Sequence, residues 1–130
     1  MNNYVRFGVI LLISTNMNAG EQDPLYKSID TYLAKYRQSI ASDGLSLRNG
    51  IIRLEMNGRR TNIQSQLLLG FYSIGRALQR TNIRCKEVQV VIHYELKVGR
   101  EVFARANTEE VLELTRGKLS VEQFFAIIWY

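Results

Sequence analysis

Residues 45–56 read LSLRNGIIRLEM, which is two runs of alternating apolar and polar residues on either side of Asn49-Gly50. Alternation with a period of two is typical of a half-buried strand, because successive side chains point to opposite faces of a sheet. Asn-Gly is a strong hairpin signal, since both turn positions must accept a positive φ. The stretch therefore predicts an antiparallel hairpin whose buried face carries Ile52, Leu54 and Met56.

Helices are predicted on both sides of this hairpin. Asp23-Pro24 favours a helix start, and the apolar residues that follow recur at three- and four-residue spacing, so we expect a helix over residues 24–41. A second apolar stripe predicts a central helix over about 62–80. Gly70 and Gly75 lie inside that helix. Each costs about 1 kcal/mol relative to alanine, which indicates either close approach of a neighbouring element or simple tolerance.

The C-terminal half repeats the pattern. Residues 88–97 alternate as a strand, residues 101–106 form a second strand, and a helix capped by Thr108 ends at Gly117 before a last short helix. The predicted order is therefore α-ββ-α-ββ-α. This order is typical of an α+β two-layer sandwich, with helices on one face of an antiparallel sheet of about four strands from two hairpins.

Residues 1–19 have the three-part pattern of a signal peptide. Arg6 lies in a short polar start, residues 7–13 are apolar apart from one glycine, and the segment ends in the small residue Ala19. The apolar run is shorter than the roughly 20 residues that span a bilayer. We expect cleavage after Ala19, a single domain over residues 20–130, and a periplasmic or secreted protein. The alternative is a buried N-terminal element of a cytoplasmic protein.

Chemical motifs are scarce. The single cysteine, Cys85, cannot form an internal disulfide. Its basic neighbours Arg84 and Lys86 favour the thiolate, whereas the alternatives are an inert thiol at a strand edge or an intermolecular disulfide. The sequence contains no cluster of metal-ligand residues and no phosphate-loop, dinucleotide or haem motif. No metal or cofactor is therefore expected.

Arginine is the main candidate for function. The net charge is +5, and residues 48–86 contain eight basic residues and one acid, Glu55. Arg76 and Arg80 are four residues apart and so face the same way on a helix, and arginine suits bidentate contacts with carboxylate or phosphate. The residues predicted to bind an anion or a partner are Arg59, Arg60, Arg76, Arg80 and Arg84. A solvated charged face is the alternative.

The expected partner is an acidic protein, a lipid head group or a glycan. Nucleic acid is not expected, because helix-turn-helix and single-strand stacking signatures are missing and the tyrosines fall mostly on core-facing stripes. His93 lies on the polar face of its strand near Gln89 and Glu95, and no spacing marks the partners of a catalytic triad. We therefore expect a surface or partly buried strand histidine.

The sequence thus predicts a small exported, non-catalytic binding or envelope-assembly accessory protein that uses a basic, arginine-rich face. Two alternatives stay open. One is a small hydrolase or transferase with a site near His93. The other is a homodimeric structural module that pairs through its apolar C-terminus or a sheet edge.

Overall fold

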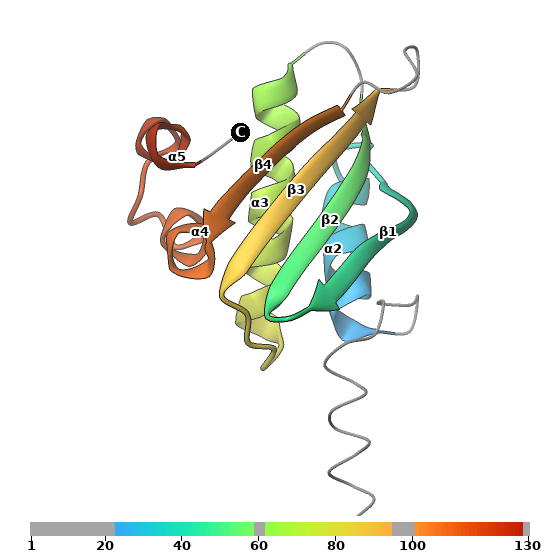
Figure 1. Cartoon of the computed structure of the whole chain (residues 1–130), viewed down its shortest axis with the longest axis horizontal. Helices are drawn as coiled ribbons and strands as arrows, with labels where there is room; N and C mark the ends of the chain where they lie inside the picture. The colour runs from blue at the N-terminus through green and yellow to red at the C-terminus, as the bar shows by residue number, and fades with distance from the viewer. Residues whose placement is uncertain (1–22, 59–61, 95–100, 129–130) are drawn as a thin grey trace, which may run out of the picture.

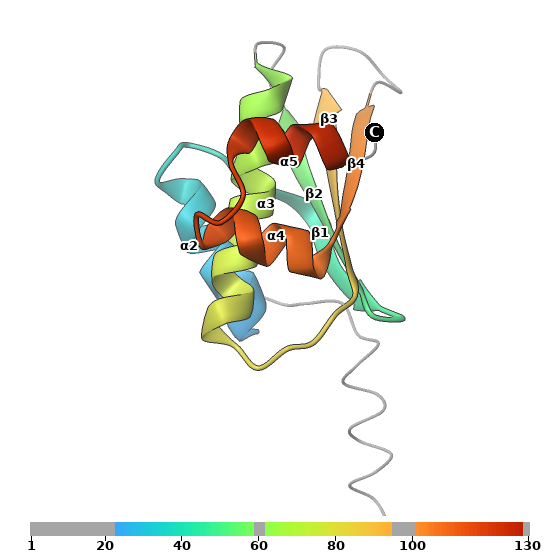
Figure 2. The same cartoon turned by 90° about the vertical axis from the view of Figure 1, so that its left-hand side faces the viewer.

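The structure, a computed structural model, describes residues 23–58, 62–94 and 101–128. Within these ranges the chain forms four helices and one four-stranded sheet of order β1-β2-β3-β4. The elements are α2 (Pro24–Ala34), β1 (Ile40–Arg48), β2 (Ile51–Gly58), α3 (Ile63–Arg80), β3 (Glu87–Tyr94), β4 (Glu101–Asn107), α4 (Thr108–Thr115) and α5 (Val121–Ile127). The helices lie on one side of the sheet (Figures 1 and 2). The predicted α+β architecture is confirmed.

The centre of the sheet differs from the prediction. The outer pairs, β1–β2 and β3–β4, are antiparallel as expected, but β2 and β3 are parallel, with Ile52 opposite Val88 and Met56 opposite Ile92. The sheet is therefore mixed, and the prediction of a fully antiparallel sheet is wrong. The cause is α3, whose 18 residues span about 27 Å. That length matches an eight-residue strand of about 26 Å, so α3 returns the chain to the end where β2 began.

The first helix is shorter than predicted. It ends at Ala34, and Ile40 belongs to β1, where it pairs with Met56. The reason is Arg37, whose φ of 58° turns the chain into the left-handed region. The Gln38 N–H donates to the Leu33 carbonyl and the Arg37 N–H to the Ala34 carbonyl, which closes the helix as a Schellman motif. Because this position holds arginine instead of the usual glycine, the end of the helix could not be recognised from the sequence.

The other turn, helix and strand boundaries either lie at or near their predicted positions or fall outside the described ranges. Asn49 and Gly50 both have positive φ, 53° and 77°, so the predicted hairpin turn is confirmed. The central helix also lies where it was expected. The N-cap of α4 is Asn107, one residue before the predicted Thr108, and the Glu110 carboxylate accepts a hydrogen bond from the Asn107 N–H. The end of the strand predicted over residues 88–97 lies partly outside the described residues.

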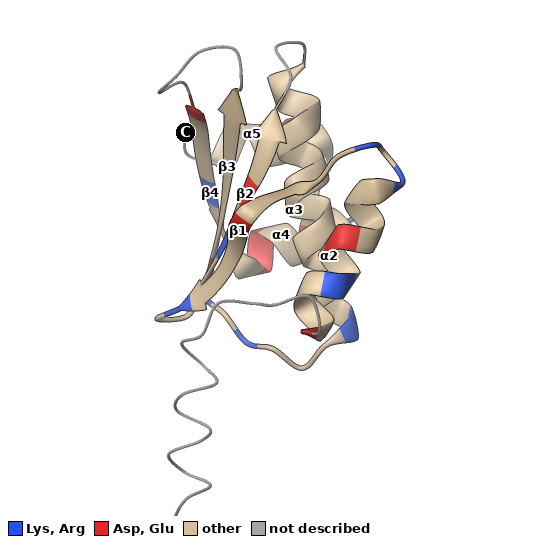
Figure 3. Cartoon of the chain, turned by 90° about the vertical axis from the view of Figure 1, so that its right-hand side faces the viewer, with Lys and Arg blue, Asp and Glu red and all other residues tan. Residues whose placement is uncertain are grey.

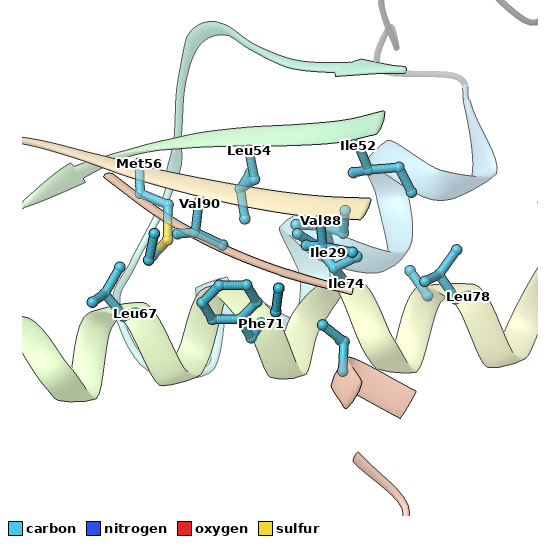
Figure 4. Packing of buried hydrophobic residues seen from close by; sticks show 14 of the residues in the cluster. Ile29, Ile52, Leu54, Met56, Leu67, Phe71, Ile74, Leu78, Val88 and Val90 are labelled. Atoms are coloured by element: carbon cyan, nitrogen blue, oxygen red, sulfur yellow. The ribbon is translucent and has the colours of Figure 1, made fainter. Parts of the chain in front are cut away.

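The core lies between the sheet and the helices. Strand residues such as Leu54 and Val90 point at Phe71 of α3 (Figure 4). Phe124 of α5 is fully buried and its ring centroid lies 5.0 Å from that of Phe71. Ile128 is also buried, so part of the apolar C-terminal segment packs within its own chain. Pairing of two copies through that segment stays a prediction.

Close approach explains the helical glycines. A Cβ on Gly70 would lie 2.8 Å from Val90 Cγ1, and a Cβ on Gly75 would overlap the Thr115 hydroxyl of α4. Separations this short leave no room for a side chain, so α3 packs more closely on β3 and α4 than an alanine would allow.

Among the described helices, none combines the length and the apolar content that crossing a membrane requires.

Candidate functional site

The structure separates the predicted arginines into two environments. Arg76 and Arg80 lie near the C-terminal end of α3, and Arg84 follows in the loop to β3. Arg76 is half-buried against α2, whereas Arg80 and Arg84 are exposed. Arg59 and Arg60 lie outside the described residues. The five arginines therefore do not form one described surface.

Arg76 belongs to an aromatic cluster. Its guanidinium carbon lies 5.2 Å from the ring centroid of Tyr32, a cation–π distance. The Tyr32 ring in turn lies 5.4 Å from the Tyr36 ring, with the planes tilted by 49°. Tyr36 is 50% exposed. We call Tyr32, Tyr36 and Arg76 the tyrosine–arginine patch.

The patch lies on two helices, α2 and α3, that pack against each other. Leu25, Ile29 and Leu33 are fully or almost fully buried on the side of α2 that faces the core, and Tyr32 lies beside that row. The Tyr36 N–H donates to the Leu33 carbonyl at 3.0 Å, which fixes Tyr36 just beyond the helix. The Gln66 Nε2 of α3 donates to Gln38 Oε1 at 3.2 Å. Hydrogen bonds and burial therefore hold both sides of the patch in place.

The electrostatics of the patch favour a partner that accepts hydrogen bonds. Burial, followed by a hydrogen bond and electrostatic interaction with Tyr36, raises the pKa of Tyr32, although Arg76 acts in the opposite direction. The Tyr32 hydroxyl is therefore protonated at neutral pH, and Arg76 gives the patch a positive charge. Hydroxyl and guanidinium groups together suit carboxylate oxygens.

A second basic surface lies where the β1–β2 turn meets the α3–β3 loop, an end of the molecule that carries several blue segments in Figure 3. The Lys86 N–H donates to the Gly50 carbonyl at 2.7 Å, which joins the loop to the turn. Four exposed residues make up this basic end: Arg48, Arg80, Arg84 and Lys86. Within the described part of the chain, no carboxylate lies within ion-pair distance of Arg80, Arg84 or Lys86.

His93 is held between two carboxylates on the sheet face that the helices leave uncovered. Its Nε2 lies 2.6 Å from Glu55 Oε1, and its Nδ1 lies 3.1 Å from Glu101 Oε2. Glu101 is directly opposite His93 in the β3–β4 register. Glu95, the neighbour noted in the sequence, lies outside the described residues. The observed partners come from other strands and could not be read from local spacing.

The histidine cluster is suited to structure rather than catalysis. Both ring nitrogens face carboxylates, so neither is free to take a proton from a nucleophile. The two carboxylates lie against different nitrogens and do not converge on one point. Over the described ranges, no group of three or more metal-ligand residues could hold an ion.

Neighbouring side chains show what the cluster does. Arg53 Nε lies 3.3 Å from Glu55 Oε2, and the Arg53 guanidinium lies 5.9 Å from the centroid of the Phe103 ring. Burial alone would raise the pKa of Glu55, but hydrogen bonds from His93 and Arg53 outweigh it and lower the pKa. Val91, which points to this side of the sheet, is 0% exposed. The polar side chains around Val91 therefore cover it and shield this part of the sheet face from solvent.

Cys85 is partly buried in the same end of the fold as Lys86. Its Sγ lies 3.0 Å from Thr108 Oγ1. Burial raises the pKa of the Cys85 thiol, and the contact with Thr108 opposes this only in part. A raised pKa favours the thiol over the thiolate, so the structure supports an inert cysteine rather than a reactive one.

Described hollows offer little room for a substrate. One, of ≈ 30 Å³, is the size of a single water and is lined by Glu87, Arg105, Ala106, Asn107, Glu110 and Ile127. A shallow depression of ≈ 370 Å³ lies along α2 and is lined by residues of that helix alone, Tyr26, Lys27, Asp30 and Thr31. Because one helix forms its whole lining, it cannot enclose a ligand.

Comparison with known proteins finds no matching family, no matching curated protein and no matching solved structure. Sequence reasoning identified Arg76 but missed Tyr32 and Tyr36 as its neighbours, because both tyrosines share the apolar spacing of the first helix. The signal that could have separated Tyr36 from the core is the early end of that helix, which places it outside the buried row.

Proposed function

We propose that the protein is an exported, non-catalytic binding protein that holds an acidic segment of a partner protein on its tyrosine–arginine patch. The observation that carries the proposal is the half-exposed Tyr36 ring beside Tyr32 and Arg76. Tyrosine and arginine are, with tryptophan, the residues enriched in the energetic centres of protein interfaces. Tyrosine provides a large contact area and loses little side-chain entropy on binding.

Charge supports an acidic partner. Within the described residues, no carboxylate lies within ion-pair distance of Arg76. Lys35 and Arg37 flank Tyr36 and are both exposed, so the patch has a positive rim. Complementary charge speeds encounter and selects a partner more than it adds affinity.

Two further features favour binding over chemistry and a place outside the cytoplasm. Both nitrogens of His93 face carboxylates, and the described hollows do not enclose a substrate. The pattern of residues 1–19 is that of a secretory signal. Together they support an envelope or secreted accessory protein.

The proposal is tested by capture from envelope extract with the full chain as bait. Arg76→Gln and Tyr36→Ala should each lower the amount of one acidic protein captured by at least tenfold, which corresponds to the loss of an interface anchor. Arg116→Gln is the matched control, because Arg116 is exposed after α4 and its loss changes the net charge equally.

The captured protein must then bind the purified wild-type chain in a titration, with the same order of affinities among the variants. Equal capture by wild type, Arg76→Gln and Tyr36→Ala would show that the patch is not the binding surface. Loss of binding with Arg116→Gln as well would indicate an effect of net charge alone.

A further inference from the structure

We infer that two copies of this chain pair through the outer edge of β1, so that their two sheets join into one. The pairing surface consists of that edge and the flank of α2 beside it. It is separate from the tyrosine–arginine patch and does not depend on the proposed function. β1 is the first strand in the sheet order, so β2 covers only one of its two edges. The other edge faces the viewer in Figure 3.

The hydrogen-bond pattern of the hairpin shows which backbone groups of β1 point outward. Arg48 and Ile51 flank the two-residue turn and face each other, so they form a hydrogen-bonded pair, and such pairs recur at every second residue. Ser46 belongs to the next such pair. The N–H and C=O groups of Leu45 and Leu47 therefore point away from β2. Within the described residues, no other backbone group donates to them or accepts from them.

These outward groups are self-complementary about Ser46. In an antiparallel pair with a twofold axis at Ser46, Leu45 of each copy faces Leu47 of the other. Each of the two facing pairs exchanges two hydrogen bonds, so every outward donor and acceptor of the two segments finds a partner. The strand is irregular between Ile40 and Leu45, where Asp43 has a φ of 53°. This irregularity limits regular pairing to the short segment that follows it and disfavours other registers.

Apolar side chains at the edge extend the core toward a second copy. Leu45 is buried and Leu47 is half-buried, and both pack on the helix side of the sheet. Tyr26 of α2 is also half-buried and lies on the other side of the buried helix row from Tyr32, which contacts Arg76 of α3. In the pair, leucines of the two copies face each other on the helix side, so the apolar layer continues across the axis.

Charge complementarity favours a second copy over an unrelated strand. Lys27 and Asp30 are exposed on α2 and line the shallow depression together with Tyr26. Neither has an ion-pair partner in the described part of the chain. In Figure 3 this helix lies beside β1, and its blue and red bands are these two residues. The twofold axis sets the two α2 helices antiparallel, which brings Lys27 of each copy toward Asp30 of the other.

The first test is a cross-link at the axis, made in the full chain with Cys85→Ser so that the added cysteine is the only one. Ser46→Cys should form a disulfide-linked dimer on mild oxidation, because a residue on the axis faces its own copy with Cβ atoms about 5 Å apart. Ser42→Cys is the matched control. It is exposed on the same strand, but its two copies would lie about 25 Å apart. Cross-linking at position 46 should be at least tenfold faster.

The second test is a charge swap, measured by sedimentation equilibrium over a series of protein concentrations. Wild type should approach twice the mass of one chain as the concentration rises. Asp30→Lys places like charges across the axis and should raise the dissociation constant of the dimer about tenfold. Adding Lys27→Asp restores opposite charges and should return the constant to within about twofold of wild type. Arg76→Gln should dimerise like wild type, which separates this surface from the tyrosine–arginine patch.

Three results would overturn the inference. The first is the mass of a single chain at concentrations up to about 100 μM. The second is equal cross-linking by Ser46→Cys and Ser42→Cys, which would place any dimer contact elsewhere. The third is a dissociation constant that Asp30→Lys leaves unchanged. All variants carry the same residues 1–22, so any contribution of that segment to the measured mass is equal in each, and a thermal melt checks that each variant is folded.

Discussion

Replacing Gly75 by alanine tests how closely α3 and α4 pack. A Cβ at this position would overlap Thr115 Oγ1 and would lie 3.0 Å from Thr115 Cβ and 3.3 Å from Val111 Cγ1. The Thr115 hydroxyl donates to the Val111 carbonyl at 2.8 Å. The new methyl group can therefore enter only if the Thr115 hydroxyl rotates out of its hydrogen bond or α4 moves away from α3.

Opposing contributions set the size of the effect. Alanine gains about 1 kcal/mol over glycine inside a helix. Overpacking costs about 1–3 kcal/mol, and loss of the Thr115 hydrogen bond costs about 1 kcal/mol. Gly75→Ala should therefore lower the free energy of unfolding by about 1–3 kcal/mol, which lowers Tm by roughly 4 °C per kcal/mol in a domain of this size.

Urea denaturation of four proteins measures this: wild type, Gly75→Ala, Thr115→Ala and the double variant. Because Thr115→Ala removes the hydroxyl that the new methyl meets, the double variant should be more stable than the sum of the single effects predicts. Gln79→Ala, an exposed change on the same helix, should alter stability by less than about 0.5 kcal/mol. A Gly75→Ala protein as stable as wild type, or strictly additive effects, would show that the new methyl group does not clash with Thr115.

Three further predictions concern the titratable groups. Hydrogen bonds lower the pKa of Glu55 in the folded protein, so they stabilise the fold above the unfolded pKa of this carboxyl, and their contribution is lost as the pH falls through its folded pKa. Glu55→Gln should therefore make the free energy of unfolding depend less on pH on the acid side. An unchanged acid-side dependence would contradict this. The Tyr94 hydroxyl is buried with no partner in the described part of the chain, so Tyr94→Phe should leave stability unchanged or raise it by up to about 2 kcal/mol in urea denaturation, whereas a clear loss would reveal a hidden partner. Because burial raises the pKa of the Cys85 thiol, iodoacetamide should react more slowly with the folded protein than with the urea-unfolded protein, and equal rates would show an accessible thiolate.

Much of the fold could be predicted because its signals are local. The Asn49-Gly50 turn, the central helix and the alternating strands each depend on residues close together in the chain. The failures came where a distant contact overrode a local pattern. Ile40 fits the apolar spacing of a helix, but it pairs with Met56 once Arg37 has turned the chain. The parallel β2–β3 pair likewise follows from where α3 delivers the chain.

Local patterns in the sequence are enough to establish the α+β class, the faces of the helices and strands, and the concentration of arginine in one segment of the chain. The tertiary structure was needed to show that Arg76 lies against Tyr32 and that His93 lies between Glu55 and Glu101. It was also needed to separate Arg76, in the tyrosine–arginine patch, from the arginines of the basic end. The physical reason is that local spacing fixes which face a residue occupies, whereas sheet register and helix packing fix which distant residue faces it. His93 and Glu55 are 38 positions apart, and no local periodicity reaches that far.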